Sequence, residues 1–386
     1  MPNVGDTFVP KGLAATLRDV AEQGPDYMIT GPWAEAFIAK ANQMGWKIRP
    51  EHMIETPPRW VDPLRYRHHE YEIVSLGPPQ AQGLYIAVAL GVLKHLGIRD
   101  IKPGTAEYFW AMGHALRHAG RHWEYAQDDT IYDIPRDEVL DDAYHAHLAK
   151  LIRKSRPKVD LTGHIRLAGD GATGGSDVMA VYAGTGGRAR YGHSEATQPT
   201  GSCEISVVDV QGNWVQMMNT LQGSGIPGMV IGGVPMVGSH STFGALMSPM
   251  DATLVKGAKA RCIIGNTLVL KDGRPVLSAG SPGNVHCTVP QVLAYALDLK
   301  LDPYAAVDAP RMLPMSEARS ITVEDRLAPG VIEDLHKLGV RVTALPGYDY
   351  HMGSFSVIAR DEQTGRYTAI ADPRRCAVAD GIGAGE

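Results

Sequence analysis

The feature that most constrains this chain of 386 residues is an abrupt change of composition near its middle. From about residue 168 to residue 201 the sequence is rich in Gly, Ser, Thr and Ala and has few large apolar side chains. Such a segment buries too little apolar surface to offset the entropy lost on ordering, so we predict a mobile linker there. The fold must therefore combine two halves of different character.

The half before the linker is predicted to be mainly helical, because its apolar residues recur with helical spacing and glycines end the runs. In chain order the predicted elements are helices over 13–21 and 33–41, a strand over 71–76, an apolar helix ending at Gly97, and a helix over about 105–122.

The half after the linker is predicted to be rich in hairpins, because β-branched runs are separated by turns that contain glycine. The predicted strand pairs are 204–210 with 214–218, 266–270 with 275–278, and 354–360 with 367–371, with a helix over about 285–299. Strands that carry helices on their faces imply a layered sandwich with antiparallel sheets.

Composition and charge exclude several classes of function. The net charge of −5 argues against a broad nucleic-acid interface. The longest apolar run, near 84–93, is too short to span a bilayer, and the first residues lack the features of a signal peptide. We therefore expect no membrane role and a cytoplasmic location. The four cysteines form no CxxC unit, which argues against a disulfide scaffold and a structural zinc site.

The end of the linker places a serine at the start of a predicted strand, in the segment Gly201-Ser202-Cys203. Cleavage of the peptide bond before Ser202 would give this residue a free α-amine beside its own hydroxyl. A serine hydroxyl needs a base to become a good nucleophile, and an α-amine with a pKa of about 7.7–8.0 serves near neutral pH. We therefore predict a self-generated nucleophile at Ser202. The alternatives are Cys203 as the new terminus and an ordinary loop serine.

A second chemical feature is the segment Gly-Ser-Pro-Gly-Asn at 280–284, directly before a predicted helix. Backbone N–H groups at a glycine turn and a helix start form a pocket for an anion. In acyl transfer such a pocket stabilises the oxyanion of the transition state. The alternative interpretation is an ordinary turn that caps the helix.

Several segments, in the same order, resemble the gamma-glutamyltranspeptidases (gamma-glutamyltransferases) of the N-terminal nucleophile superfamily. The segment SCEISVVDVQGN from Ser202 is similar to the family's TTHxSVVDxxGN, and GSPG from Gly280 is similar to its GSPGG. The other similar segments are Gly5-Asp-Thr-Phe-Val with Leu13-Ala-Ala-Thr-Leu, Asn219-Thr-Leu-Gln, Thr267-Leu-Val-Leu-Lys-Asp-Gly and Ala371-Asp-Pro-Arg. The resemblance covers most of the chain and implies an α+β fold, the four-layer αββα sandwich of these hydrolases.

By position, the resemblance also implies roles for single residues. Ser202 stands where the family has its catalytic threonine, and Thr220 where a second threonine hydrogen-bonds the nucleophile and assists self-cleavage. Gln222 replaces an asparagine that positions the substrate. Gly283 and Asn284 replace the Gly-Gly pair whose amides form the oxyanion hole, and the Asn284 side chain leaves its own N–H in place.

Three departures from the family pattern concern substrate binding. The acid that holds the glutamyl ammonium has no counterpart, and Met236-Val-Gly-Ser-His stands in its place. The Ser-Ser pair that grips the α-carboxylate falls at Cys262 and Ile263, and the family's N-terminal region, with an arginine for this carboxylate, is absent. A site without these groups has little physical reason to select γ-glutamate, so another amide or acyl compound is the expected substrate.

Two histidine-rich segments are candidates for metal sites, but neither a metal nor a cofactor is expected. His114, His118 and His122 share a helix face, but no carboxylate is spaced to match them. His68 and His69 adjoin a strand start, where neighbouring side chains point to opposite faces, so they are not expected to share a metal.

Together these observations predict an amide hydrolase or acyltransferase that cuts itself before Ser202. The predicted parts are a helical, large-subunit-like segment over 1–201 and a β-rich catalytic segment over 202–386, which form one folded body. The expected partners are a small amide or acyl substrate and a second polypeptide that supplies the missing N-terminal region, because its absence would expose core surface. The alternative is an inactive or truncated family member that acts as a binding or partner subunit.

Overall fold

The computed structural model describes residues 5–7, 9–55, 60–80, 82–122, 125–155, 166–167, 202–220, 225–237, 259, 264–282, 285–314 and 320–382. The linker predicted over 168–201 lies outside these residues. The chain divides into two compact units. They are Met1–Val61 with Leu221–Thr242, and Asp62–Thr220 with Phe243–Glu386. The division into segments 1–201 and 202–386 stays a prediction.

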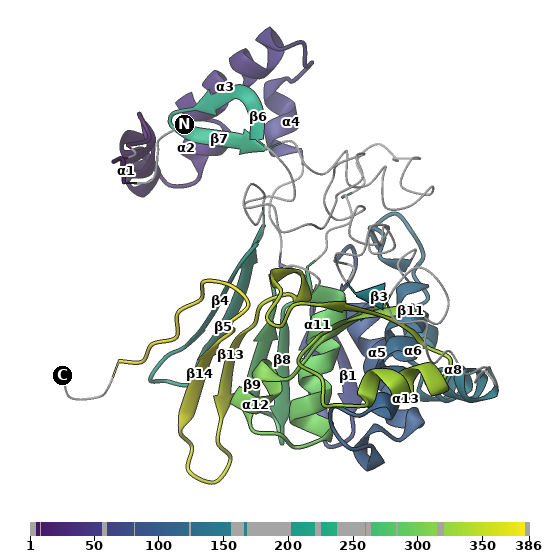
Figure 1. The fold of residues 1–386 in the computed structure, drawn as a ribbon. Helices are drawn as coiled ribbons and strands as arrows, with labels where there is room; N and C mark the ends of the chain where they lie inside the picture. The colour runs from purple at the N-terminus through teal and green to yellow at the C-terminus, as the bar shows by residue number, and fades with distance from the viewer. Residues whose placement is uncertain are drawn as a thin grey trace. The chain divides into compact units, whose positions relative to one another are not determined.

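The first unit packs short helices around one hairpin (Figure 1). Its described elements are α1 (Leu13–Gln23), α2 (Asp26–Ile29), α3 (Pro32–Gln43), α4 (Pro50–Ile54), β6 (Gly225–Ile231) and β7 (Val234–Val237). Trp33 and Phe37 of α3 are buried against Met229 and Ile231 of β6. The indole of Trp33 also donates a hydrogen bond to the Ile231 carbonyl at 3.1 Å, so helix and hairpin are joined by packing and by a polar contact.

The second unit is built on a six-stranded antiparallel sheet (Figure 1). In spatial order its strands are β1 (Leu64–His68), β2 (Tyr71–Ser75), β8 (Thr267–Lys271), β9 (Arg274–Gly280), β13 (Ser356–Arg360) and β14 (Tyr367–Ala371). The sheet therefore brings a strand pair from the first half of the chain beside two hairpins from the second half.

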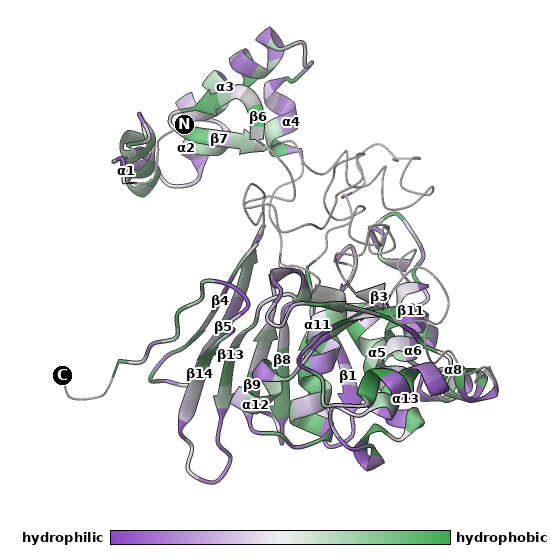
Figure 2. Cartoon of the chain, in the orientation of Figure 1, coloured by the Kyte–Doolittle hydropathy of each residue, from purple (hydrophilic) through white to green (hydrophobic). Residues whose placement is uncertain are grey.

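Helices of the second unit form its main core. They are α5 (Gln82–Leu96), α6 (Ala106–Gly120), α7 (Arg136–Leu140), α8 (Asp142–Lys154), α11 (Val285–Leu293), α12 (Pro303–Asp308) and α13 (Val331–Lys337), with short turns η1 (Ile98–Asp100), η5 (Ala294–Asp298) and η6 (Tyr350–Met352). Helix α5 is apolar all round because it packs on α6, α8, α11 and β1. Figure 2 shows that α13 instead mixes hydrophobic and hydrophilic residues, as expected for a helix with one exposed face.

A second, four-stranded sheet follows the order β10 (Met312–Pro314), β11 (Ser320–Glu324), β12 (Arg341–Leu345) and β3 (Arg166–Leu167). Its β11–β12 and β12–β3 pairs are parallel, so the expectation of antiparallel sheets alone was wrong here. The parallel β11–β12 pair arises because helix α13 forms the crossover between the two strands.

A two-stranded hairpin, β4 (Cys203–Val208) with β5 (Trp214–Asn219), stacks on the six-stranded sheet. It contacts β13 and β9, and hydroxyls join the layers. Ser206 Oγ donates to the Ser356 carbonyl at 3.4 Å, and Ser356 Oγ donates to the Glu204 carbonyl at 3.3 Å. The hairpin is thereby a separate β layer over the end of the larger sheet.

The protein is α+β, with helices and antiparallel sheets that match the predicted helices and all three predicted hairpins. Strands β1, β3, β6, β7 and β10 to β12 were not predicted from the sequence. Among the described residues, no helix has the length and apolar character needed to cross a membrane.

Candidate functional site

The predicted nucleophile lies at the open end of the β4–β5 hairpin. Ser202 directly precedes β4, whose first residue, Cys203, pairs with Asn219 in antiparallel register. Continuing this register by one position sets Ser202 opposite Thr220, and both side chains are half-buried. Directly opposed residues of an antiparallel pair have Cβ atoms about 4.5–5.5 Å apart. The two residues that the sequence singled out separately are therefore cross-strand neighbours.

Strand alternation divides this hairpin into two faces. Ser202, Glu204 and Ser206 share the half-buried inner face that meets the larger sheet. Cys203 is exposed on the outer face, which also carries the apolar side chain of Ile205. The Cys203 thiol thus points away from the face on which Ser202 and Thr220 lie.

The inner face of the hairpin meets the start of the Gly-Ser-Pro-Gly segment. The carboxyl of Glu204 and the side-chain amide of Gln216 lie so close to Gly280 that a Cβ on this glycine would collide with both. Asn266 Nδ2 donates to Glu204 Oε1 at 2.9 Å, and the Thr267 N–H donates to Gln216 Oε1 at 3.0 Å. The strand that follows Ser202 is therefore fixed against the end of β9.

The segment beyond Gly280 is anchored by a buried serine. Ser281 is fully buried, and its hydroxyl accepts a hydrogen bond from the Ser354 N–H at 3.1 Å. Gly280 itself pairs with Ser356 of β13. The start of the predicted oxyanion turn is thus held by the same sheet that supports the hairpin of Ser202.

Five predicted site residues lie outside the described residues, namely Gln222, Cys262, Ile263, Gly283 and Asn284. Their assigned roles in substrate binding and oxyanion stabilisation stay predictions. Of the predicted site residues that the structure describes, Ser202 and Thr220 come together on one face of the hairpin.

Glu204 is a residue of this site that the sequence analysis did not single out. Burial raises the pKa of its carboxyl to about 8, because a charged carboxylate loses hydration there. Its Oε1 accepts from Asn266, whereas its buried Oε2 has no hydrogen-bond partner among the described residues. The sequence signal that could have identified Glu204 is an acidic residue two positions after the predicted nucleophile, on the same face of the predicted strand.

A buried ion network explains the C-terminal Ala-Asp-Pro-Arg segment. Arg374 donates to both carboxylate oxygens of Glu324, at 2.6 and 2.7 Å, and Arg311 pairs with Asp372. Asp372 Oδ2 also accepts from the Phe355 N–H at 3.0 Å, which ties the network to the start of β13. Burial opposes ionisation of Asp372, but the two guanidinium groups outweigh it and hold its pKa below the usual value. The network is a structural support for the sheet beneath the hairpin.

The premise that His68 and His69 point to opposite faces was wrong, because both side chains turn toward one buried carboxylate, whereas the expectation that they do not share a metal stays a prediction. Both imidazole Nε2 atoms reach the buried carboxylate of Asp298, at 2.9 Å for His68 and 3.3 Å for His69. Strand alternation fails here because His69 has left the strand, in a left-handed turn with φ of 53°. Arg99 also approaches Asp298, at 3.5 Å, so this carboxylate already has a cationic neighbour.

The other histidine cluster does not converge on a metal-binding geometry in the part of the chain that the structure describes. His122 Nε2 lies 2.9 Å from the Tyr144 hydroxyl, and its Nδ1 faces the His118 carbonyl at 3.0 Å. Burial, followed by the nearby Arg121 and Arg117, lowers the pKa of His118 to about 4. These side chains therefore serve helix packing.

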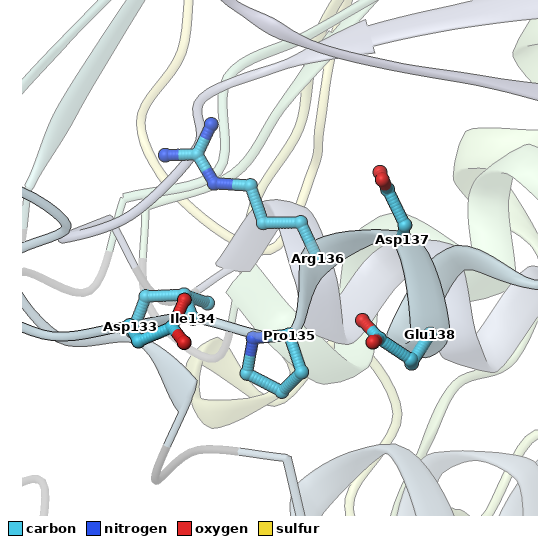
Figure 3. A pocket seen from close by; sticks show the side chains of 6 residues that line it. All are labelled: Asp133, Ile134, Pro135, Arg136, Asp137 and Glu138. Atoms are coloured by element: carbon cyan, nitrogen blue, oxygen red, sulfur yellow. The ribbon is translucent and has the colours of Figure 1, made fainter.

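A surface hollow near α7 is separate from the Ser202 hairpin (Figure 3). All its lining residues come from one continuous segment, residues 133–138. Figure 3 shows the charged groups of Arg136, Asp137 and Glu138 pointing in different directions rather than toward one centre. The hollow therefore offers no convergent set of groups for catalysis.

Comparisons with known proteins agree with this architecture. The family model for gamma-glutamyltranspeptidase matches residues 1–382. The glutathione hydrolase proenzyme of Escherichia coli (strain K12) is 25% identical over 354 residues, covering 88% of this chain and 56% of that protein. The Acylase ACY 1 proenzyme of Pseudomonas sp. (strain SE83) is 22% identical over 382 residues, covering 98% of this chain and 63% of that protein.

A similar fold is seen in the crystal structure of cephalosporin acylase from Bacillus halodurans. It has a TM-score of 0.74 and 21% identity, and the match covers 99% of this chain and 65% of that one. The chain belongs to the gamma-glutamyltranspeptidase family. It spans 56% and 62% of the length of the glutathione hydrolase proenzymes of Escherichia coli and Bacillus subtilis (strain 168).

Proposed function

We propose that this chain is an N-terminal nucleophile amide hydrolase or acyltransferase that cuts itself between residues 201 and 202. The observation that carries the proposal is the position of Ser202, opposite Thr220 and on the hairpin face that meets Gly280. This arrangement combines a serine at a strand start, a hydroxyl neighbour and the first residue of the predicted oxyanion turn. The related proteins named as proenzymes support the self-cleavage step.

Self-cleavage starts with attack of Ser202 Oγ on the carbonyl carbon of Gly201. The C–N bond breaks as the hydroxyl proton passes to the amide nitrogen, and water then hydrolyses the resulting ester. The products are a C-terminal carboxylate at residue 201 and a Ser202 that carries both a hydroxyl and an α-amine. Thr220 acts as the hydroxyl that hydrogen-bonds Ser202 during this step.

In turnover the freed α-amine acts as the general base. It takes the proton of Ser202 Oγ as the oxygen attacks the substrate amide, and then gives that proton to the departing amine. The backbone N–H groups of Gly283 and Asn284 hold the oxyanion. Water or an acceptor amine then attacks the acyl-enzyme and releases the acyl group.

The substrate is proposed to be a small amide or acyl compound other than a γ-glutamyl one. The named relatives include both glutathione hydrolases and acylases, so the family accommodates different acyl groups. In this chain the glutamate-binding acid is replaced by Met236-Val-Gly-Ser-His, and Gln222, Cys262 and Ile263 are proposed as substrate-contacting positions. Residues of this kind favour a less charged acyl group.

The full four-layer αββα sandwich is also proposed, because the hairpin layer stacks on the six-stranded sheet of a unit whose core is helical. The outer face of this hairpin is apolar and exposed, with Ile205, Val207, Val215 and Met217 each 46–58% accessible. An apolar sheet face of this kind is typical of a surface that packs on another layer. A second polypeptide, from the part of the family that this chain does not span, is the proposed cover.

The mass of the purified protein tests the proposed function. We expect two fragments that meet at residues 201 and 202, and we expect Ser202→Ala to stay intact. Cys203→Ala is the matched control, because its side chain lies on the opposite face and the variant should still be cut. Chain that stays whole on prolonged incubation would instead favour an inactive binding or partner subunit. Anilides of γ-glutamate and of plain acyl groups then identify the acyl class, and brisk γ-glutamyl turnover would contradict the proposed selectivity.

A further inference from the structure

Glu204 occupies an unusual place for an acid, because the side chains that contact it among the described residues are polar but uncharged. It lies two residues after Ser202 on the same face of the strand, with its carboxyl over Gly280. Asn266 from the approach to β8 donates to its Oε1, and Gln216 of β5 lies beside it over the same glycine. From β13, Ser356 Oγ donates to the Glu204 carbonyl.

The charge state of Glu204 follows from these contacts. Among the described residues, no charged side chain accounts for its shift, and desolvation alone raises the pKa to about 8. The buried Oε2, without a hydrogen-bond partner in that part of the chain, also favours the protonated acid. At neutral pH the group next to the nucleophile is therefore mostly an uncharged carboxylic acid.

We propose that Glu204 is a positioning residue of the Ser202 site, which works only while its carboxyl is protonated. The inference rests on the proposed function and adds to it a residue that the family pattern does not supply, since that pattern has a histidine at this position. The neutral acid fixes the strand against Gly280 through Asn266 and leaves the site free of negative charge.

Ionisation of Glu204 would harm both reacting groups of the site. A carboxylate two residues from Ser202 would stabilise the protonated α-ammonium and so remove the free amine that serves as base. A negative charge over Gly280 would also oppose the oxyanion that forms at the following turn. Proton loss from this one side chain therefore slows turnover through both effects and self-cleavage through the oxyanion alone, because the α-amine exists only after the chain is cut.

The test is the pH profile of the wild-type protein against Glu204→Gln. We expect wild-type self-cleavage and kcat/KM on the best anilide substrate to fall above about pH 8, approaching about tenfold per pH unit. Glu204→Gln stays neutral and is close in shape, so this alkaline fall should disappear from both profiles, while the acid limb of kcat/KM due to the α-amine remains. Glu204→Asp, which can ionise, should keep an alkaline fall.

The outcomes separate this inference from the proposed function. Glu362→Gln, at an exposed acid paired with Lys271, is the control and should leave the profile unchanged. If the wild type is active and Glu204→Gln shows the same alkaline fall, the role of Glu204 is wrong and the proposed function stands. If the wild type neither cleaves itself nor turns over any anilide at any pH, both are wrong. Circular dichroism of each variant shows that the comparison is between folded proteins.

Discussion

Glu204 is a half-buried acid and Asp372 a buried one, and their surroundings move their pKa values in opposite directions. Glu204 meets only neutral groups among the described residues, so desolvation raises its pKa to about 8. Asp372 is also desolvated, yet Arg311 and Arg374 outweigh this effect and lower its pKa. The sequence alone reveals neither of these two pKa shifts, because both depend on residues that are distant along the chain.

The raised pKa of Glu204 makes the stability of the folded chain depend on pH. The folded state binds this proton more tightly than the unfolded state, in which the glutamate pKa is near its ordinary value of 4.5. The stabilisation is therefore complete below about pH 4.5 and is lost as pH rises toward about 8. Urea unfolding at several pH values should show a smaller decline for Glu204→Gln than for wild type. A constant difference between the two proteins across that range would contradict the assignment.

Thr220 should contribute to self-cleavage through its hydroxyl. Thr220→Ala removes the proposed hydrogen bond to Ser202, worth about 0.5–1.5 kcal/mol, so we expect the rate of cleavage to fall roughly 2- to 12-fold. Thr220→Ser keeps the hydroxyl and should cut at nearly the wild-type rate. Fragment formation followed by mass spectrometry measures both, and equal rates for Ala and Ser would show that the hydroxyl has no role.

At the scale of elements, the hairpin β4–β5 is the part that local sequence predicts best. Its turn is stabilised by residues that are adjacent in the sequence. Asp209 Oδ1 accepts hydrogen bonds from the backbone N–H groups of Gln211 and Asn213 at 2.9 and 2.8 Å, and Gly212 adopts a φ of 83°. The stacking of this hairpin on β9 and β13 depends on contacts between distant segments and has no local signal. The approach of His69 to Asp298 also joins distant segments. It could not be predicted from strand alternation, because a left-handed turn at His69 interrupts that alternation.

Because the hairpin lies so close to β9, we predict that adding a side chain at Gly280 destabilises the fold. Gly280→Ala forces the Glu204 carboxyl and the Gln216 amide to move, at a cost of about 1–3 kcal/mol in the free energy of unfolding. Combining Gly280→Ala with Glu204→Ala should cost less than the sum of the two single changes. Gly120→Ala in α6, where the new Cβ makes only ordinary contact with Tyr85, is the control and should be close to neutral. If the losses in the free energy of unfolding add up in the double variant, the side chains at positions 204 and 280 do not clash.

At the scale of the whole molecule, the second unit is a helical core with a sheet on which the β4–β5 hairpin rests. Composition and periodicity predicted five of the helical segments and three hairpins, and the family motifs singled out the hairpin on which we propose the nucleophile lies. Composition, periodicity and motifs did not predict the four-stranded mixed sheet. The sequences of the short strands β10 and β11 do not indicate whether they pair with a neighbour in the chain or with a distant strand. Composition, periodicity and motifs also gave no account of the buried Arg374–Glu324 pair.

This buried pair should matter more to stability than any exposed one. Arg374→Met leaves the Glu324 and Asp372 carboxylates with fewer cationic partners, and we expect a loss of about 3–5 kcal/mol in the free energy of unfolding. Lys337→Met, which breaks an exposed pair with Asp334, should change stability by less than about 1 kcal/mol. Chemical denaturation measures both variants, and equal losses would contradict the structural importance of the network.

The exposed outer face of the β4–β5 hairpin carries a cysteine that can be labelled chemically. Cys203 is exposed there, whereas Cys287 is buried and the exposed Cys376 lies near the C-terminal end of the described residues. The rate at which a thiol reagent modifies Cys203, relative to Cys376, therefore reports whether another polypeptide covers the hairpin. If the thiol of Cys203 is alkylated rapidly in the protein alone and slowly in the presence of the proposed second polypeptide, that partner covers the hairpin, and no measurement of catalysis is needed.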